Sequence, residues 1–155
     1  FTSPSVISPM RYKPPRWTAY YNNFAVADRK AAIRMTQIGE GDQATHFEMR
    51  TADASANAYL MLAGMSHAGI LGLEKNIKEV PSVPTSSAQK NKHPNIYRLP
   101  ETLEECLQQL EHDIDFIKKF DQEFLRSYLA VKHYEIRLLH GRSEAELIQL
   151  HTKHY

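Results

Sequence analysis

The sequence predicts an α+β fold, in which antiparallel strands come first and a C-terminal helical bundle follows. Apolar and polar residues alternate over 44–51, directly after the turn-forming letters GEGD, which indicates the return strand of a β-hairpin. Residues 58–73 are apolar or small almost all round, which indicates a buried helix. Beyond residue 101, apolar residues recur every three or four positions, as in amphipathic helices.

The composition suits a small globular protein without a strongly charged partner. The chain has 155 residues, 42% of them hydrophobic, which is enough for one domain with its own core. A formal net charge of +1 provides no basic field for nucleic acid. The longest apolar run, about sixteen residues, is too short to span a membrane. The single Cys106 excludes a disulfide framework and fits a reducing compartment, so we expect a cytoplasmic protein. From the charge and the short apolar run, we expect neither a nucleic-acid partner nor a membrane partner.

The first elements are a connector and a set of short strands. Serine and proline favour extended backbone over residues 1–16. This segment has neither an initiator methionine nor a signal peptide, so we expect the chain to be a fragment of a longer protein. Residues 17–38 are aromatic and β-branched in places, with polar interruptions, which predicts broken strands. The turn over Gly39–Asp42 then leads into the return strand.

The helices are predicted from periodicity and from capping residues. Asp53 or Ser55 would cap the buried helix, and a polar loop with three prolines follows over 80–95. Gly141 suits the position just after a helix end, and Ser143 with Glu146 would form the capping box of a last short helix. Between the loop and Gly141 we expect two amphipathic helices, within residues 103–117 and 124–139.

The hairpin carries charged residues on one face. Alternation places His46, Glu48 and Arg50 together, and Arg34 on the preceding strand would arrive opposite or near Glu48. One interpretation is a solvated sheet face, in which an Arg34–Glu48 cross-strand pair contributes only a fraction of a kcal/mol to stability. The other is an anion and metal site, because guanidinium groups bind phosphates and carboxylates bidentately and a carboxylate can ligate Mg²⁺. The local pattern leaves both open.

Several blocks of sequence, in order, resemble the catalytic domain of class I glutamine synthetases and their γ-glutamyl ligase relatives. They read ADRKAAIR, FEMR, DASANAYLMLAGMSHAGILGLEKNI and NIYRLPETLEECLQQLEHD. The resemblance covers nearly the whole chain, but only the C-terminal part of the family's catalytic domain, and the family's N-terminal β-grasp domain is absent from it. It implies a catalytic-sheet and site segment, the buried helix, a loop and helices, over residues 1–52, 53–79, 80–100 and 101–155.

The resemblance implies an ATP-dependent ligase. Such an enzyme joins ammonia to the γ-carboxylate of glutamate through γ-glutamyl phosphate, gives glutamine, and uses ATP with Mg²⁺ or Mn²⁺. The family builds its active sites between neighbouring subunits of a homo-oligomer, a dodecamer of two stacked hexamers. Because an N-terminal domain and further metal ligands lie outside the chain, we expect these 155 residues alone to be inactive.

The same resemblance implies roles for individual residues. Arg29 matches the arginine at the phosphate-transfer centre, which also binds ATP, and Arg34 matches one that contacts the ATP phosphates. Glu48 matches a metal ligand. Arg50 matches the catalytic arginine that steadies the glutamate γ-carboxylate and the phosphorylated intermediate, and Arg11 matches the arginine that binds the substrate α-carboxylate. Since Arg29 and Arg34 are five residues apart, a bend must separate them if both are to face one site.

The sequence also departs from the family pattern. Asp28 stands where the family usually has asparagine, and His46 stands where many members have another ATP-contacting arginine. Ala54 and Ala58 replace two prolines. These changes leave the amine open, so the alternatives are a γ-glutamyl ligase for an organic amine (methylamide, ethanolamine or polyamine type) and a non-catalytic structural homologue.

Tyr97 is a separate candidate. It matches a tyrosine that some bacterial members adenylylate, which makes it a possible modification site. The alternative is an aromatic anchor with a buried ring, because tyrosine commonly buries its ring.

Overall fold

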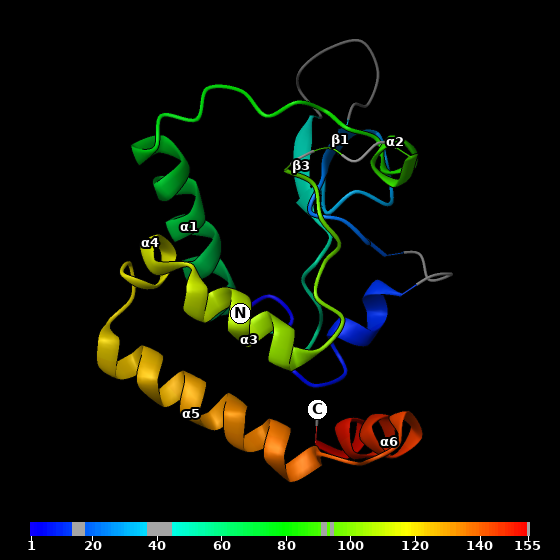
Figure 1. Cartoon of the computed structure of the whole chain (residues 1–155), viewed down its shortest axis with the longest axis vertical. Coiled ribbons are helices and arrows are strands. Elements are labelled where there is room, and N and C mark those ends of the chain that lie inside the picture. Colours follow the sequence, from blue (N-terminus) through cyan, green and yellow to red (C-terminus); the bar gives the residue numbers. More distant parts are fainter. Residues whose placement is uncertain (14–17, 37–44, 91–92, 94, 155) are drawn as a thin grey trace. The chain divides into compact units, whose positions relative to one another are not determined.

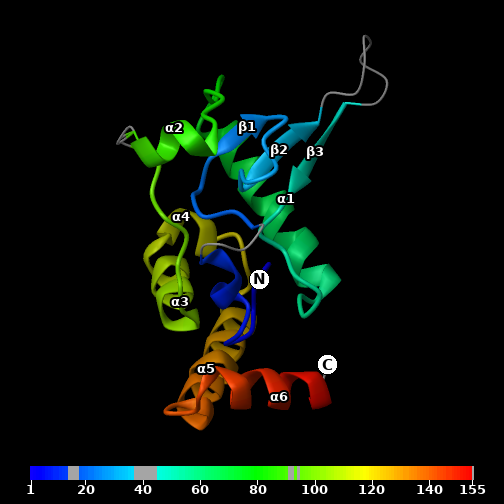
Figure 2. The same cartoon turned by 90° about the vertical axis from the view of Figure 1, so that its right-hand side faces the viewer.

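A computed structural model describes residues 1–13, 18–36, 45–90, 93 and 95–154, which fall into two compact units. The helical unit comprises residues 1–10, 53–77 and 100–155, and the sheet unit comprises residues 11–52 and 78–99. Figures 1 and 2 together label the α-helices and strands of both. Strands precede most of the helices along the chain, which agrees with the α+β class. In the described ranges, no helix combines the length and apolar character needed to cross a membrane.

The sheet unit contains a mixed three-stranded sheet with the order β1-β2-β3 (Figure 2). Strands β2 (Ile33–Thr36) and β3 (His46–Met49) are antiparallel and bring Arg34 directly opposite Glu48, so the expected hairpin register is confirmed. The hairpin's turn residues, Gly39–Asp42, lie outside the described residues.

The first strand differs from the sequence-based expectation. Strand β1 (Phe24–Val26) pairs with β2 in parallel, so the prediction of antiparallel strands throughout is wrong for this pair. The residues between them form a tight loop in which Ala27 has a positive φ of 57°. That loop returns the chain to the starting end of β1, and alternation of side chains carries no information about strand direction.

A short helix occupies part of the predicted polar loop. Residues Thr85–Lys90 form α2, and just before it Val83 donates its backbone N–H to the Phe24 carbonyl oxygen at 2.9 Å. The segment ahead of α2 therefore runs along β1.

The helical unit begins with α1 (Ala58–Glu74), whose cap differs from the prediction. Asn57 is the N-cap, and its side-chain oxygen accepts hydrogen bonds from the two amides at Tyr59 and Leu60. The expectation that Asp53 or Ser55 caps the helix is wrong. The Asp53 carboxylate instead accepts the Ser55 amide and hydroxyl, in a turn that ends before the helix begins.

Helix α1 is also far more exposed than predicted. Gly64 is its one fully buried residue, whereas Tyr59 is 84% exposed and Leu73 80%. The core of the helical unit lies elsewhere. It consists of leucines from the later helices and an aromatic cluster in which the Phe1 ring contacts four others, those of Phe116, Phe120, Phe124 and Tyr128.

The later helices follow the predicted order with one interruption. The first predicted amphipathic helix divides at Asp113, which ends one helix and caps the next by accepting the Phe116 amide. Gly141 has the left-handed φ of 78° expected just after a helix end, and the Ser143–Glu146 capping box is confirmed. Packing of these helices as a bundle stays a prediction. Their bounds are α3 Leu103–His112, α4 Ile114–Ile117, α5 Gln122–Leu139 and α6 Glu144–His154.

Candidate active site

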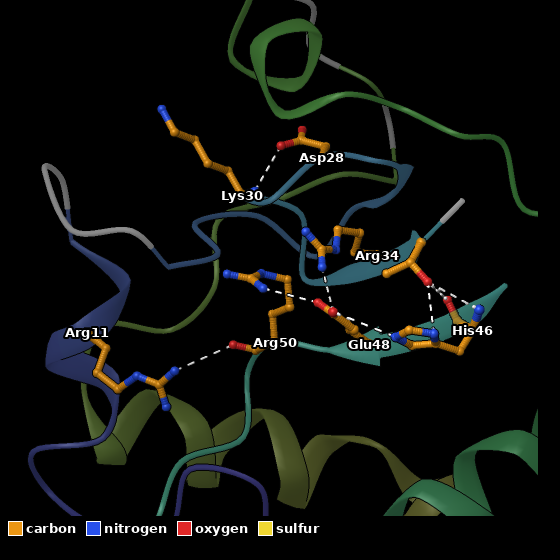
Figure 3. A network of polar contacts seen from close by, with 8 residues as sticks. Arg11, Asp28, Lys30, Arg34, His46, Glu48 and Arg50 are labelled. Carbon is orange, nitrogen blue, oxygen red and sulfur yellow. Dashed lines mark hydrogen bonds and ion pairs between the residues drawn. The ribbon is translucent and has the colours of Figure 1, made fainter. Parts of the chain in front are cut away.

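Glu48 is held between two arginines on the paired strands β2 and β3. Oε1 of Glu48 lies 2.5 Å from Nη2 of Arg34, and Oε2 lies 3.2 Å from Nη1 of Arg50 (Figure 3). The strand register explains the first contact, because Arg34 is the cross-strand neighbour of Glu48. Arg50 comes two residues after Glu48, which returns its side chain to the same face. Three of the candidate site residues therefore meet as the sequence suggested.

A threonine and a histidine extend this cluster. The Oγ1 of Thr36, a buried residue, lies 3.0 Å from Nδ1 of His46 and also donates to the His46 carbonyl oxygen. The other ring nitrogen, Nε2, lies 3.8 Å from Oε1 of Glu48. His46 thus faces the same carboxylate from the end of β3. Thr36 gave no sequence signal beyond its place in a strand.

The cluster carries more positive than negative charge. The hydrogen bond from Arg34 has the largest effect on the pKa of Glu48 and lowers it below its ordinary value. Desolvation opposes this effect, and the hydrogen bond from Arg50 adds to the lowering. Glu48 is therefore ionised at neutral pH, and two guanidinium groups leave one positive charge in excess. The Nε atoms of Arg34 and Arg50 are buried and form no hydrogen bond with any described residue. The side chains of Arg34 and Arg50 are nevertheless 17% and 26% exposed, and guanidinium groups bind phosphate or carboxylate oxygens in proteins.

Arg11 holds the backbone that follows β3. It belongs to a 3-10 turn, Pro9–Tyr12, and its Nη1 donates to the Ala52 carbonyl oxygen at 2.9 Å. Its Nη2 lies 3.5 Å from the carbonyl oxygen of Arg50 (Figure 3). The guanidinium is therefore next to the Arg50 backbone and does not contact Glu48.

Arg29 lies apart from the Glu48 cluster in its contacts. It sits in the turn between β1 and β2, its side chain is exposed, and it forms no hydrogen bond or ion pair with another described residue. The bend required between Arg29 and Arg34 is present, since the Ala31 amide donates to the Asp28 carbonyl oxygen at 3.3 Å in a turn around Arg29, and β2 starts only at Ile33.

The Asp28 carboxylate has backbone partners. It accepts the amides of Lys30 at 2.8 Å and Thr85 at 2.7 Å, so its charge is compensated within the fold. Sequence reasoning noticed this aspartate but not its partner at Thr85, because 57 residues separate the two.

Tyr97 is presented on a fixed backbone, with its side chain 58% exposed. Its amide donates to Oδ1 of Asn22 at 2.8 Å, and its carbonyl oxygen accepts the Asn22 amide at 3.1 Å. The alternative of a buried aromatic anchor is therefore wrong for this chain. In the sequence, Asn22 is only one of the polar residues that interrupt the strands predicted over 17–38, and nothing there indicates its contact with Tyr97.

Among the described residues, Glu48 alone would supply a ligand to a metal ion at this site. No group of three or more His, Cys, Asp or Glu side chains converges anywhere in those ranges. Magnesium is commonly bound through one or two carboxylates, with water and phosphate oxygens completing six ligands. Glu48 supplies one such carboxylate, and any remaining ligands have to come from phosphates, water or other parts of the protein.

Comparison with known proteins identifies the family. The model of the glutamine synthetase catalytic domain matches residues 1–149. This chain belongs to the glutamine synthetase family. It is 32% identical over 146 residues to the glutamine synthetase of Aquifex aeolicus, and 29% identical over 143 residues to that of Sulfolobus acidocaldarius. Each alignment covers 88% of this chain and 30% of the relative.

A solved structure described as a novel glutamine synthase homolog shares the fold. It is 28% identical in sequence and superposes with a TM-score of 0.82. The match covers 99% of this chain and 34% of the chain in that structure. The resemblance predicted from the sequence blocks is therefore confirmed at the level of the family. The chain spans 30% of the length of each of these two curated glutamine synthetases.

Proposed function

We propose that the protein carrying this chain ligates ammonia to the γ-carboxylate of glutamate at the expense of ATP, through γ-glutamyl phosphate. The observation that carries the proposal is the Arg34–Glu48–Arg50 cluster on paired strands, in a chain whose relatives are named glutamine synthetase. With this function we propose a cytoplasmic homo-oligomer, a dodecamer of stacked hexamers, with glutamate, ammonia and ATP as substrates.

The charges of the cluster suit phosphoryl transfer. A transferring phosphoryl group spreads negative charge over its oxygens, so preorganised cations stabilise it without covalent chemistry. Arg34 would contact the nucleotide phosphates from β2, and Arg50 would hold the γ-carboxylate and the phosphorylated intermediate from β3. Bound at Glu48, Mg²⁺ or Mn²⁺ would neutralise charge on the phosphates. The excess positive charge around Glu48 supports these assignments.

The two remaining arginines bind elsewhere in this proposal. Arg29, exposed in its turn and without a partner in the described part of the chain, is available to the transferring phosphate. Arg11 would bind the α-carboxylate of glutamate, and its contact with the Arg50 carbonyl oxygen keeps the two glutamate-binding arginines near each other. Tyr97 is proposed as a modification site on the strength of its exposed ring.

The function is tested on the full-length parent protein. We would follow glutamate-dependent phosphate release from Mg·ATP with ammonium, methylamine, ethanolamine and putrescine in parallel. Arg50→Ala removes one side of the cluster, and Arg126→Ala, an exposed arginine on α5, is the matched control. We expect release to be highest with ammonium, abolished by Arg50→Ala and retained by Arg126→Ala.

The other outcomes separate the alternatives. A preference for an organic amine would make the protein a γ-glutamyl ligase of that amine class. Silence with every amine would indicate a non-catalytic homologue, although an intact Arg34–Glu48–Arg50 cluster argues against it. The 155-residue chain assayed alone should release no phosphate above background, and turnover by it would contradict a site that needs further protein.

A further inference from the structure

The turn that carries Arg29 is tied to a distant segment by one side chain. Oδ1 of Asp28 accepts the Lys30 amide at 2.8 Å, within the turn (Figure 3), and Oδ2 accepts the Thr85 amide at 2.7 Å. Thr85 is the first residue of α2. One carboxylate thus links the β1–β2 turn to the start of α2.

The segment on the far side of this link is itself fixed. Its Val83 amide donates to the Phe24 carbonyl oxygen at 2.9 Å, and Nδ2 of Asn23 donates to the Val83 carbonyl oxygen at 2.8 Å and to Oγ1 of Thr85 at 3.3 Å. Asn23 and Thr85 are each 2% exposed. Asp28 therefore accepts its hydrogen bond from a donor that has little freedom to move.

The turn needs such a link because its backbone is strained. Ala27 has a φ of 57°, in the left-handed region that residues other than glycine rarely adopt, and it directly precedes Asp28. Arg29 follows, with an exposed side chain that no described residue holds. The backbone of the turn consequently sets where the Arg29 side chain starts and which region its guanidinium can reach.

We propose that Asp28 is a positioning residue, whose carboxylate clamps the turn to the start of α2 so that Arg29 is held ready for the transferring phosphate. The inference rests on the proposed function, because that function gives Arg29 its role. It also explains how a carboxylate can stand beside an anion site where the family usually has asparagine.

The negative charge of Asp28 is stabilised by the two amides that it accepts in the clamp. Burial alone would raise the pKa of Asp28, but the amide of Thr85, and then that of Lys30, lower it below the ordinary value. The carboxylate is ionised at neutral pH and accepts both amides. An asparagine has one side-chain oxygen, so it can accept from both only by sharing that atom.

The test removes the clamp from each of its two ends in the full-length parent. Asp28→Ala deletes the acceptor. Thr85→Pro deletes the donated N–H, and Thr85→Val is its matched control, since both lose the hydroxyl and only proline lacks the amide hydrogen. Asp28→Asn keeps one acceptor. Asp121→Ala is the control for aspartate loss, because Asp121 also accepts two backbone amides, at the start of α5.

We expect Asp28→Ala and Thr85→Pro to lower kcat by about 10- to 100-fold, as misplacement of a catalytic group does. The KM for glutamate should change less than about twofold, because the clamp leaves the strand that carries Arg50 in place. Asp28→Asn should recover part of kcat. Thr85→Val should lower kcat less than Thr85→Pro, because it loses the hydroxyl contact with Asp28 but keeps the donated amide. Asp121→Ala should retain kcat per folded molecule. Wild-type kcat in Asp28→Ala, alongside a collapse in Arg29→Ala, would overturn the proposal.

Hydrogen exchange makes the clamp testable without activity. If the parent shows no glutamate-dependent phosphate release, the proposed function fails, and exchange of the amides of residues 27–36 still reports on the clamp. Faster exchange there in Asp28→Ala and Thr85→Pro, but not in Asp121→Ala, supports it. Unchanged exchange overturns it. A fall in kcat for Asp28→Ala without any fall for Arg29→Ala would overturn the role through Arg29.

Discussion

Strong sequence patterns predicted both the β2–β3 pair and helix α1. The charged residues of the strand pair find partners within the chain, whereas many apolar residues of α1 do not. In the strand pair, Glu48 has an arginine on each of its carboxylate oxygens. In α1, the large apolar residues Tyr59, Leu62 and Leu73 remain exposed. Ion pairs across a ladder need only the neighbouring strand, whereas burial of an apolar helix needs a covering surface.

One side of α1 exposes large apolar residues, among them Leu62 and Leu73. Its opposite side packs on aromatic rings, with Gly64 close to Phe1 and His67 against Phe120. On the exposed side, a Cβ added at Gly69 or Gly72 would meet nothing within 4 Å. Contiguous exposed apolar surface promotes association. We therefore expect the isolated chain to self-associate or to fold poorly.

The largest expected effect is the loss of phosphate release when the Glu48 carboxylate is removed from the β2–β3 pair. In the full-length parent, Glu48→Gln deletes the charge between Arg34 and Arg50 and the proposed metal ligand. We expect phosphate release to fall by at least about 100-fold, the scale on which removal of one preorganised electrostatic group acts. The measurement is kcat with ammonium at saturating glutamate and ATP.

The matched control for that substitution is Glu111→Gln. Glu111 also contacts a nitrogen of a basic residue, with its Oε1 3.2 Å from Nε2 of His133, but it lies on α3 outside the candidate site. We expect its activity to stay within about twofold of wild type, as for most exposed pairs. Equal losses in both variants would mean that the Glu48 cluster has no special role.

The second largest effect separates buried from exposed leucines in the helical unit. Leu107 on α3 is 3% exposed and Leu73 on α1 is 80% exposed. Leu107→Ala should lower the free energy of unfolding by about 2–5 kcal/mol, because it removes buried methyl groups and leaves a cavity. Leu73→Ala should change it by less than about 0.5 kcal/mol. Urea denaturation of both variants in the same protein measures the difference.

A large loss in Leu73→Ala would show that α1 is covered in the protein tested. Sedimentation of the isolated chain gives a second measurement of the same surface. There, Leu73→Ser together with Leu62→Ser should raise the monomer fraction if α1 mediates association.

Local signals of the fold were readable from the sequence. The hairpin register, the glycine stop at Gly141 and the Ser143–Glu146 capping box depend on residues a few positions apart or on one turn. The parallel pairing of β1 and the helix α2 were missed, because both depend on where a segment docks. Residues 80–95 have the composition of a loop, and α2 lies within them, next to β1.

The candidate site divides in the same way. The meeting of Arg34, Glu48 and Arg50 followed from strand alternation and pairing. The clamp between Asp28 and Thr85 did not, since the two residues are 57 positions apart and no sequence motif links them. The roles of the arginines toward ATP and glutamate came from resemblance to the family and stay predictions.

A smaller effect distinguishes the observed cap of α1 from the predicted one. Asn57→Ala removes the acceptor for the Tyr59 and Leu60 amides, so we expect a loss of about 1 kcal/mol in the free energy of unfolding. Ser55→Ala should cost less, because Ser55 lies in the turn ahead of the helix. Thermal denaturation of the two variants decides between the caps, and a larger loss in Ser55→Ala would reverse the assignment.

The smallest effect is the pH dependence of the Glu48 cluster. The pKa of Glu48 is lowered in the folded protein, so the unfolded chain binds the proton more readily. The contribution of the cluster to stability is therefore fully present well above the ordinary value of 4.5 and is lost as the pH falls through the lower folded value. Since the pair is close to solvent, we expect a modest shift in Tm.

Glu48→Gln isolates this titration from those of other carboxylates. The Tm difference between wild type and Glu48→Gln, followed from pH 7 down to about pH 3, should shrink as the wild-type carboxylate becomes protonated. High salt should reduce the difference at neutral pH, because mobile ions screen exposed pairs. A difference that stays constant across this range would mean that Arg34 and Arg50 do not stabilise the ionised form of Glu48. The β2–β3 pair would then be held by its backbone hydrogen bonds and not by the ion pairs.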